Sequence, residues 1–301
     1  MGGSQFWGRM FRDGETALQA DCGGFDSLRL HQFFFTVGIF IVMKRKLSWR
    51  PDIPDQRDYT FSQMVLGQTP SPMATDGSNI NLRYWCSAIE DQETLGSCVS
   101  NAVVGLFEFN RNYSGLGGKN YRNFSRLFNY YNSRVLNETV DEDSGTYIRD
   151  AIKSAKLNGI CFEYEWPYDL EIWMNEPPLS CYRNAVNFKV SHYYRLETLD
   201  EMKTSLANFH PFVFGIAVYE SFMSEQVATT GIIPLPSYRE SLLGGHAMLS
   251  IGYDDSLQCF LVRNSWGKTW GIQSGNLGGY CWVPYNYLTD RNLSDDFWTA
   301  Y

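Results

Sequence analysis

One cysteine of this chain lies where a thiol can be activated for nucleophilic attack. Residues 91–101 read Asp-Gln-Glu-Thr-Leu-Gly-Ser-Cys-Val-Ser-Asn, a polar turn that runs into a predicted helix with Cys98 in its first turn. The N-terminal end of a helix favours thiolate over thiol, and the thiolate is the nucleophilic form. A free cysteine is more often a small buried hydrophobic residue, so its position alone leaves both interpretations open.

Two distant segments supply the partners that a nucleophilic thiol requires. His246 follows two glycines and opens an apolar run, residues 247–253, that predicts a buried strand. A second strand-like run, residues 259–263, ends in Asn264-Ser265-Trp266-Gly267. A single histidine or amide at a strand end is usually structural. A cysteine, a histidine and an amide in this order are, however, the parts of a thiol-based acyl-transfer site.

These segments together resemble the papain-like cysteine peptidases. The resemblance is carried by the run from Gln92 to Cys98, by Gly245-His246-Ala247 and by residues 264–271, Asn-Ser-Trp-Gly-Lys-Thr-Trp-Gly. The steps of six residues from Gln92 to Cys98 and of 148 from Cys98 to His246 match the family. The likeness extends from about Arg50 to about Asp290 and is closest to compact bacterial and giant-virus members, whose Asp-x-Arg-Asp motif is echoed at residues 55–58.

The resemblance implies hydrolysis of peptide bonds through a thioester. Cys98 as thiolate attacks the carbonyl, and His246 as imidazolium protonates the leaving amine. Asn264 orients the imidazole, and Trp266 shields that hydrogen bond from water. Gln92 and the backbone N–H of Cys98 form the oxyanion hole. Taken separately, Gln92 could be an exposed turn amide, Trp266 a core residue and Asn264 a loop cap.

The resemblance also indicates where substrate binds. In papain relatives a glycine pair binds the substrate backbone and leaves room for the side chain that precedes the cleaved residue. Gly145 is the candidate for this role, although the usual Cys-Asn-Gly-Gly is missing here. We expect Ser144, Gly145, Gly245 and Trp266 to contact substrate. Read from the residues alone, Asp143-Ser144-Gly145 predicts an N-terminal cap for the helix that follows.

The order of the elements predicts an α+β fold of the two-lobed papain-like type. We expect a helical lobe over about 79–185 and an antiparallel, β-barrel-like lobe over about 186–290, with the active-site cleft between them. Cys98 then lies on the helical wall, and His246 and Asn264 lie on the sheet wall. Helices are expected at 98–111, 121–136 and 146–157, strands at 188–196, 212–219, 248–253, 260–264 and 280–284, and a surface-wrapping loop at 50–78.

The leader, residues 1–50, lies outside the resemblance, which assigns residues 51–301 to the peptidase domain. Its apolar run, residues 33–43, is short of the roughly 20 residues that a membrane-spanning helix needs. Acidic residues before this run and the lack of a small-residue cleavage site argue against a signal peptide. Three interpretations remain: a pro-segment that blocks the cleft of a zymogen, a weak membrane-associating element, or a dispensable extension with Met43 as the functional start.

The cysteines point to a reducing compartment. Classical secreted relatives have a cysteine three residues before the nucleophile, where this chain has Leu95, and none accompanies Ser144 and Gly145. The standard disulfide frame is therefore absent, which favours an intracellular or virion-associated protein. Sequence alone leaves Cys161–Cys181 and Cys259–Cys281 as conceivable pairs, and Cys22–Cys98 as a conceivable redox latch.

Composition narrows the class of partner. The 301 residues carry a net charge of −8 and a sequence pI near 5.1, which argues against nucleic-acid binding. No Cys/His spacing suggests zinc, so we expect neither metal nor cofactor. The expected partners are polypeptide substrates, without firm evidence for a membrane, and the expected state is a monomer.

Two other functions fit parts of the pattern. A catalytically silent papain-like binding or structural protein would usually have lost the cysteine or the histidine, and this chain keeps both. A transglutaminase-like or amidase-like enzyme generally orients its histidine with Asp. Endopeptidase action is favoured over exopeptidase action, because the remaining histidines lack the pairing seen in the blocking loop of cathepsin B relatives; they are His31, His192 and His210.

Overall fold

The C-terminal half of the chain is organised around one antiparallel sheet. The computed structural model describes residues 45–65, 78–115 and 123–301. Within these ranges seven strands form a sheet of order β2-β7-β3-β4-β5-β6, and β1 pairs with β4 outside this path. The strands are β1 (Asn79–Asn81), β2 (Tyr193–Arg195), β3 (Phe212–Tyr219), β4 (Leu242–Asp254), β5 (Cys259–Arg263), β6 (Tyr280–Pro284) and β7 (Ser294–Ala300).

The sheet stays open, so the expectation of a barrel-like lobe is wrong in this detail. Its path ends at β2 and at β6, and β2 has only three residues, all paired with β7. The ladders of β3 with β4, β3 with β7 and β4 with β5 each contain a register shift, and such bulges bend a sheet. The α+β character of the fold is as predicted.

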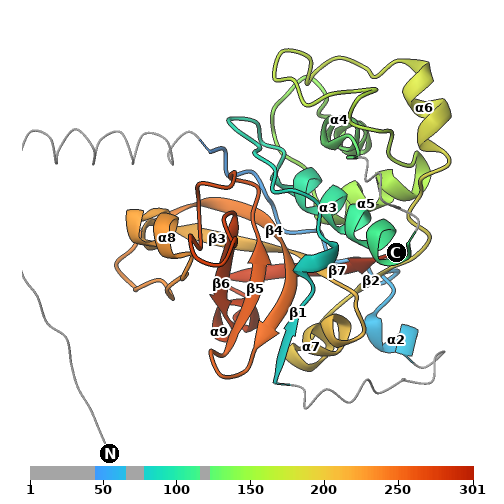
Figure 1. Cartoon of the computed structure of the whole chain (residues 1–301). Coiled ribbons are helices and arrows are strands. Elements are labelled where there is room, and N and C mark those ends of the chain that lie inside the picture. Colours follow the sequence, from blue (N-terminus) through green and yellow to red (C-terminus); the bar gives the residue numbers. More distant parts are fainter. Residues whose placement is uncertain (1–44, 66–77, 116–122) are drawn as a thin grey trace, which may run out of the picture. The chain divides into compact units, whose positions relative to one another are not determined.

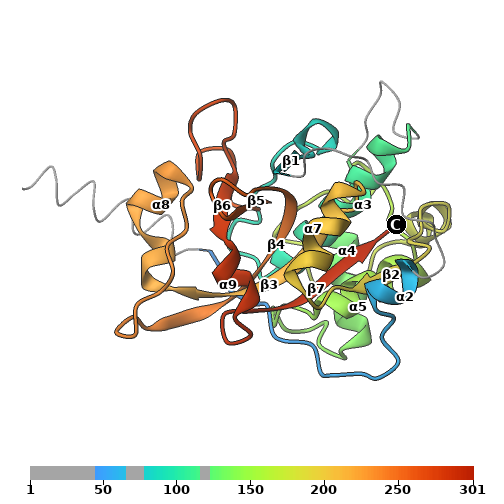
Figure 2. The same ribbon diagram turned by 90° about the horizontal axis from the view of Figure 1, so that it is seen from below.

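Helices α3, α4 and α5 lie together beside the sheet (Figure 1). α3 is the central helix, because every residue from Cys98 to Phe109 is buried and α3 packs against β4. Elsewhere on the sheet, α7 packs against β3 and β4, and α9 packs against β6 and β7 (Figure 2). The helices are α2 (Phe61–Val65), α3 (Cys98–Tyr113), α4 (Arg126–Leu136), α5 (Ile148–Leu157), α6 (Leu179–Ala185), α7 (Leu199–Ala207), α8 (Glu225–Thr230) and α9 (Tyr285–Thr289), with 3-10 turns η1 (Arg83–Trp85) and η2 (Glu220–Met223).

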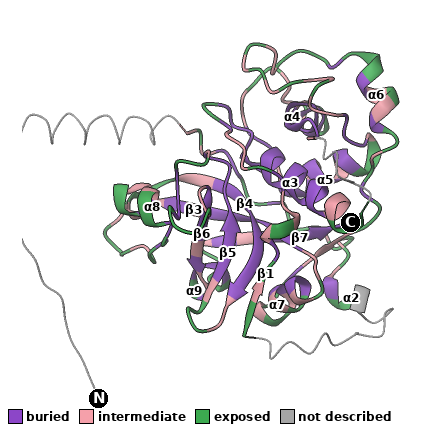
Figure 3. Ribbon diagram, viewed as in Figure 1, coloured by how far each residue is buried: buried purple, intermediate pink, exposed green. Residues whose placement is uncertain are grey.

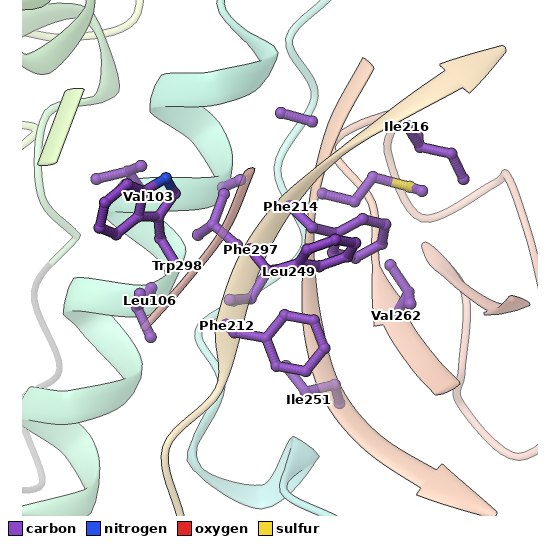
Figure 4. Packing of buried hydrophobic residues seen from close by; sticks show 14 of the residues in the cluster. Val103, Leu106, Phe212, Phe214, Ile216, Leu249, Ile251, Val262, Phe297 and Trp298 are labelled. Atoms are coloured by element: carbon purple, nitrogen blue, oxygen red, sulfur yellow. The ribbon is translucent and has the colours of Figure 1, made fainter. Parts of the chain in front are cut away.

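The core joins α3 to the sheet. Val103 and Leu106 on α3 face the aromatic side chains that rise from β3 and β7, among them Phe212 and Trp298 (Figure 4). These four side chains are at most 2% exposed. Burying a side chain of this size is worth about 1.5–3 kcal/mol, so this interface fixes α3 against the sheet. Figure 3 shows the same contrast, with α3 and β4 mostly buried and α6 and α8 largely open to solvent.

The predicted helices and strands agree best with the observed ones where the apolar sequence pattern is long. β3 has the predicted bounds, and α3, α4 and α5 lie within the predicted helices or extend them by two residues. β4 begins at Leu242, so His246 lies inside this strand and not at its entrance. The predicted cap of α5 is wrong: Tyr147 is its N-cap and makes no side-chain cap bond, because the carboxylate of Asp143 binds elsewhere.

Candidate active site

Cys98 is the first residue of α3 and is fully buried. The turn before it is held by its own backbone, with Leu95 N–H donating to Gln92 O and Ser97 N–H to Leu95 O. Cys98 also contacts the backbone N–H of Ala247, the residue after His246. The fold therefore brings the predicted nucleophile and β4 together across 148 residues of sequence, as the two-lobed arrangement requires.

His246 and Asn264 form the predicted pair. His246 Nε2 lies 2.8 Å from Asn264 Oδ1, and both side chains are buried. The amide oxygen also accepts from Ser265 N–H at 2.8 Å, which fixes its orientation. Because an amide oxygen only accepts, Nε2 carries the proton, and Nδ1 is the basic nitrogen of the neutral ring. Among the described residues Nδ1 has no hydrogen-bond partner, so it is available to take a proton.

Trp266 covers this pair. Its ring centroid lies 4.7 Å from that of His246, and only 1% of the residue is exposed. The indole stacks at 31° to the imidazole, which keeps water from the histidine–asparagine bond. Trp266 therefore lies against the imidazole with its side chain buried, and its role as the shield stays a prediction.

Gln92 links the turn before α3 to the loop after β5. It is fully buried, its Oε1 accepts from Ser265 Oγ at 2.7 Å, and its backbone N–H donates to Ser265 O at 2.8 Å. Nε2 donates to the carbonyl oxygens of Leu95 and Lys46, each at 3.1 Å. An exposed turn amide is thus excluded. An N–H donor held rigidly against a peptide carbonyl is the arrangement that an oxyanion hole needs.

Residues 45–49, here called the cleft segment, lie across these groups. Ser48 Oγ is 3.6 Å from Cys98 Sγ and donates to Gly96 O at 2.7 Å. Trp49 N–H donates to Gly245 O at 3.0 Å. A Cβ built on Gly145 would lie 2.2 Å from Ser48 O, so only glycine permits this approach. The cleft segment therefore occupies the place beside Gly145 and Gly245 where we expected a substrate.

Two ion pairs flank the cleft segment. Arg45 forms a bidentate pair with Asp91, in which Nη2 lies 2.8 Å from Oδ2, and it also donates to Trp266 O at 3.1 Å. Lys46 Nζ lies 2.8 Å from Asp143 Oδ2. The side chains of Asp91 and Lys46 are 40% and 44% exposed, so each pair stabilises the contact only modestly.

Burial in the covered site favours the neutral forms of Cys98 and His246. Burial raises the pKa of Cys98, and hydrogen bonds from Ser48, Ala247 and Val99 lower it only in part. Burial also lowers the pKa of His246 to about 4, against the opposing effect of the Asn264 bond. The expected thiolate–imidazolium pair is therefore not the state of this arrangement, because desolvation outweighs the field of the helix N-terminus.

The residues expected to bind substrate divide into two groups. Gly145, at φ +75°, and Gly245 both face the cleft segment. Ser144 Oγ donates to the adjacent Gly145 O at 3.4 Å, so its side chain turns to the backbone. Trp266 contacts the cleft segment through its backbone carbonyl oxygen, which accepts a hydrogen bond from Arg45, and not through its indole.

The sequence did not single out two residues that hold the nucleophile turn. Asp143 Oδ1 accepts from Gly96 N–H at 3.0 Å and from the hydroxyl of Tyr130. Tyr168 OH donates to Gln92 O at 2.8 Å and lies 2.5 Å from Ser97 Oγ. The available signal was weak, since Asp143 looked like a helix cap and Tyr168 was only part of an extended Trp-Pro-Tyr segment.

The described part of the chain shows no sign of a metal site. It contains no cluster of three or more His, Cys, Asp or Glu side chains arranged to hold a metal ion. Its six cysteines are free, including the conceivable pairs Cys161–Cys181 and Cys259–Cys281, and Cys22 lies outside the described residues. None of the helices in the ranges described combines the length and apolar character of a bilayer span.

Comparison with known proteins agrees with this geometry. Residues 72–286 match the profile of the papain family cysteine proteases. An uncharacterized peptidase C1-like protein of Acanthamoeba polyphaga mimivirus is 40% identical over 279 residues, which is 85% of this chain and 86% of that protein. Xylellain, a cysteine protease from Xylella fastidiosa, superposes with a TM-score of 0.73 at 35% identity, over 85% of this chain and 96% of its own. Digestive procathepsin L 3 of Tenebrio molitor shares the fold, at 17% identity and a TM-score of 0.58 over 86% of this chain and 77% of its own. The chain is a member of the papain family of cysteine proteases.

Proposed function

We propose that this protein is a cysteine-type endopeptidase in which Cys98 forms the thioester. The observation that carries the proposal is the set of held groups on the residues next to those that contact Cys98 and in the turn before it. His246 is held by Asn264 with its basic Nδ1 free of partners among the described residues, and the Gln92 amide binds a peptide carbonyl. These are the base, its orienting group and the oxyanion donor of acyl transfer.

The reaction follows from these positions. His246 takes the proton of Cys98, and the thiolate attacks the substrate carbonyl, whose oxygen moves to the Gln92 amide and the backbone N–H of Cys98. The imidazolium then protonates the leaving amine, which leaves an acyl group on the sulfur. Water, deprotonated by His246, hydrolyses the thioester and restores the thiol.

We further propose that the chain is made as a zymogen. Ser48 lies on the thiol, Lys46 O occupies the oxyanion-hole amide, and Trp49 binds Gly245. A substrate needs the same groups, so catalysis requires the cleft segment to leave. Its departure returns water to Cys98 and His246, which removes the desolvation that keeps both neutral. The earlier part of the leader lies outside the described residues.

The working unit that we propose is the peptidase domain of residues 51–301, acting as a monomer on polypeptides. Its helical lobe, about 79–185, carries Cys98. Its β lobe, expected over about 186–290, carries His246 and Asn264 and extends beyond 290, because β7 (Ser294–Ala300) lies between β2 and β3 in the sheet. Gly145 and Gly245 are the proposed backbone contacts for substrate, with Ser144 and Trp266 at the margins of the cleft.

The test is hydrolysis of an internally quenched peptide that is blocked at both ends, which only an endopeptidase can cleave. The full chain and its Trp49→Ala variant are compared with Cys98→Ala, and Cys259→Ala is the control for a cysteine away from the site. We expect Cys98→Ala to abolish cleavage and Cys259→Ala to preserve it. Transfer of the acyl group to an added amine in place of water would indicate a transglutaminase-like enzyme. If no chain cleaves the peptide, a catalytically silent binding protein is the better reading.

A further inference from the structure

The guanidinium of Arg126 lies buried against the turn that leads to the nucleophile. Arg126 is the first residue of α4 and is 8% exposed. Its Nη1 lies 3.3 Å from Glu90 Oε2 and donates to Asn101 Oδ1 at 3.2 Å. Glu90 precedes the turn, and Asn101 lies on α3 three residues after Cys98. One cation therefore binds both ends of the segment that carries the nucleophile.

A second contact of the guanidinium leads to the candidate oxyanion hole. Nη2 lies 3.2 Å from Glu163 Oε1, and the same carboxylate oxygen accepts from Tyr168 N–H at 2.8 Å. The guanidinium carbon also lies 4.1 Å from the centroid of the Tyr168 ring, a cation–π contact. Tyr168 OH in turn donates to Gln92 O at 2.8 Å. Arg126 thus holds Tyr168, and Tyr168 holds the residue whose side chain is the candidate oxyanion donor.

Asn101 connects the same cation to the residue before the nucleophile. Because its Oδ1 accepts from Arg126, the orientation of the amide is fixed, and its Nδ2 donates to Ser97 O and Ser97 Oγ, each at 3.0 Å. Ser97 Oγ also lies 2.5 Å from Tyr168 OH, so the two routes from Arg126 meet at Ser97. The turn is therefore held at both ends by groups that Arg126 orients.

These contacts suit an arginine better than a lysine. A guanidinium is planar and presents five N–H donors in a fixed fork, whereas the ammonium of lysine is a compact point charge. Arg126 binds two carboxylates and one amide oxygen at once. Its removal leaves two mostly buried carboxylates without this counter-charge and Asn101 Oδ1 without this donor, which is costly. We expect the turn to shift as these groups find other partners.

We propose that Arg126 is a positioning residue for acyl transfer, which fixes the Gln92 amide and the backbone N–H of Cys98 at the separation that the oxyanion requires. This inference rests on the proposed peptidase function. Within the described ranges Arg126 makes no hydrogen bond to Cys98 or His246, so it acts through the turn. Oxyanion donors are effective when they are held in place before the reaction, and a displacement of about 1 Å can cost about 10²-fold in rate.

The experiment measures kcat and KM on the blocked, internally quenched peptide in the Trp49→Ala chain, whose site is open. Adding Arg126→Ala is expected to lower kcat about 10²-fold and to change KM less than about threefold. Arg126→Lys is expected to recover only a small part of this loss, because an ammonium lacks the fork.

Arg149→Ala in the same chain is the matched control. Arg149 is also a buried arginine in the first turn of a helix, α5, and it forms an ion pair with Asp58. Because its partners lie away from the nucleophile turn, its loss is expected to lower stability and to change kcat by less than about threefold. Denaturant unfolding of each chain is measured in parallel.

Chemical rescue separates positioning from a general loss of stability. Ethylguanidinium can enter the space that Arg126→Ala leaves, and at millimolar concentration it is expected to raise kcat about tenfold. Ethylammonium is expected to have no such effect. A peptide aldehyde places an oxyanion in the same hole when it adds to Cys98, so its affinity is expected to fall in parallel with kcat.

Two results in an active Trp49→Ala chain would overturn the inference. One is a kcat for Arg126→Ala that stays within about threefold of this chain or falls no further than that of Arg149→Ala. The other is rescue by ethylammonium as effective as that by ethylguanidinium. If Arg126→Ala does not fold, Arg126→Lys decides, with an expected fall in kcat of about tenfold or more at unchanged KM. An inactive Trp49→Ala chain would instead contradict the proposed peptidase function, and the inference with it.

Discussion

Replacing Trp49 with alanine tests whether the cleft segment acts as a lid on the thiol. The indole contacts Gly215 and Gly245 and donates to Asp296, so it stabilises the closed arrangement. If these contacts exist only while the segment is bound, the substitution weakens closure and leaves the rest of the fold intact.

The size of the effect follows from burial. Truncating a buried tryptophan to alanine costs about 3–5 kcal/mol. Each 1.4 kcal/mol changes an equilibrium about tenfold, so the open fraction is expected to rise by roughly 10²- to 4 × 10³-fold, until the open form predominates. Alkylation of Cys98 through the open form rises by the same factor.

The assay is the rate of Cys98 modification by an epoxysuccinyl inhibitor, followed by intact mass and mapped by peptide analysis. Tyr59→Ala is the matched control, because Tyr59 is an aromatic residue ten positions after Trp49 that lies outside the cleft segment and is 65% exposed. Denaturant unfolding of each chain is measured in parallel. If Trp49→Ala loses about 3–5 kcal/mol of global stability while Cys98 reacts no faster, Trp49 is a permanent core residue and the lid interpretation is wrong.

Three further predictions concern the groups around the site. Asn264→Ala is expected to lower kcat on a blocked peptide about 10²-fold, because His246 loses the bond that fixes its tautomer; unchanged kcat would contradict the pairing. Tyr168→Phe removes the hydroxyl that binds Gln92 O and is expected to lower kcat several-fold with little change in KM, and a change in KM alone would argue against a role in holding the turn. Burial, and next the charge of Asp296, raise the pKa of Asp52 to about 7, so the folded protein favours its protonated form. The stability that the folded protein gains from protonated Asp52 is fully present below the unfolded pKa near 4, and it is lost as pH rises through about 7. Asp52→Asn is thus expected to flatten the fall in melting temperature between pH 5 and 8, and an unchanged slope would refute it.

The candidate catalytic residues could be picked out from the sequence because the proposed reaction restricts their types and order. A thiol at a helix start, a histidine beside glycines and an amide before Ser-Trp-Gly leave few other interpretations once they occur together. β3 was predictable for a related reason, since its unbroken apolar run has one stable environment, the interior of a sheet.

The cleft segment, the neutral state of Cys98 and strand β7 depend on contacts between distant parts of the chain, which the local sequence pattern does not reveal. Ser48 and Trp49 follow a short basic run that carries no recognisable motif. They cover the site through contacts with Cys98 and Gly245, which lie far along the chain. The neutral state of Cys98 has the same origin, because the helix N-terminus is local whereas the burial comes from a distant segment. β7 was missed since Asp295 and Asp296 interrupt its apolar pattern, and these acids are satisfied by Arg195 on another strand.

Acyl transfer through Cys98 is tested most directly by trapping the thioester. The Trp49→Ala chain is mixed with the p-nitrophenyl ester of a blocked amino acid, quenched in acid during turnover, and its intact mass is measured. We predict a mass increase equal to one acyl group, mapped to Cys98 and absent when Cys98→Ala is added to the same chain. Turnover of the ester without an adduct on Cys98, or with the acyl group on another residue, would contradict the proposed mechanism.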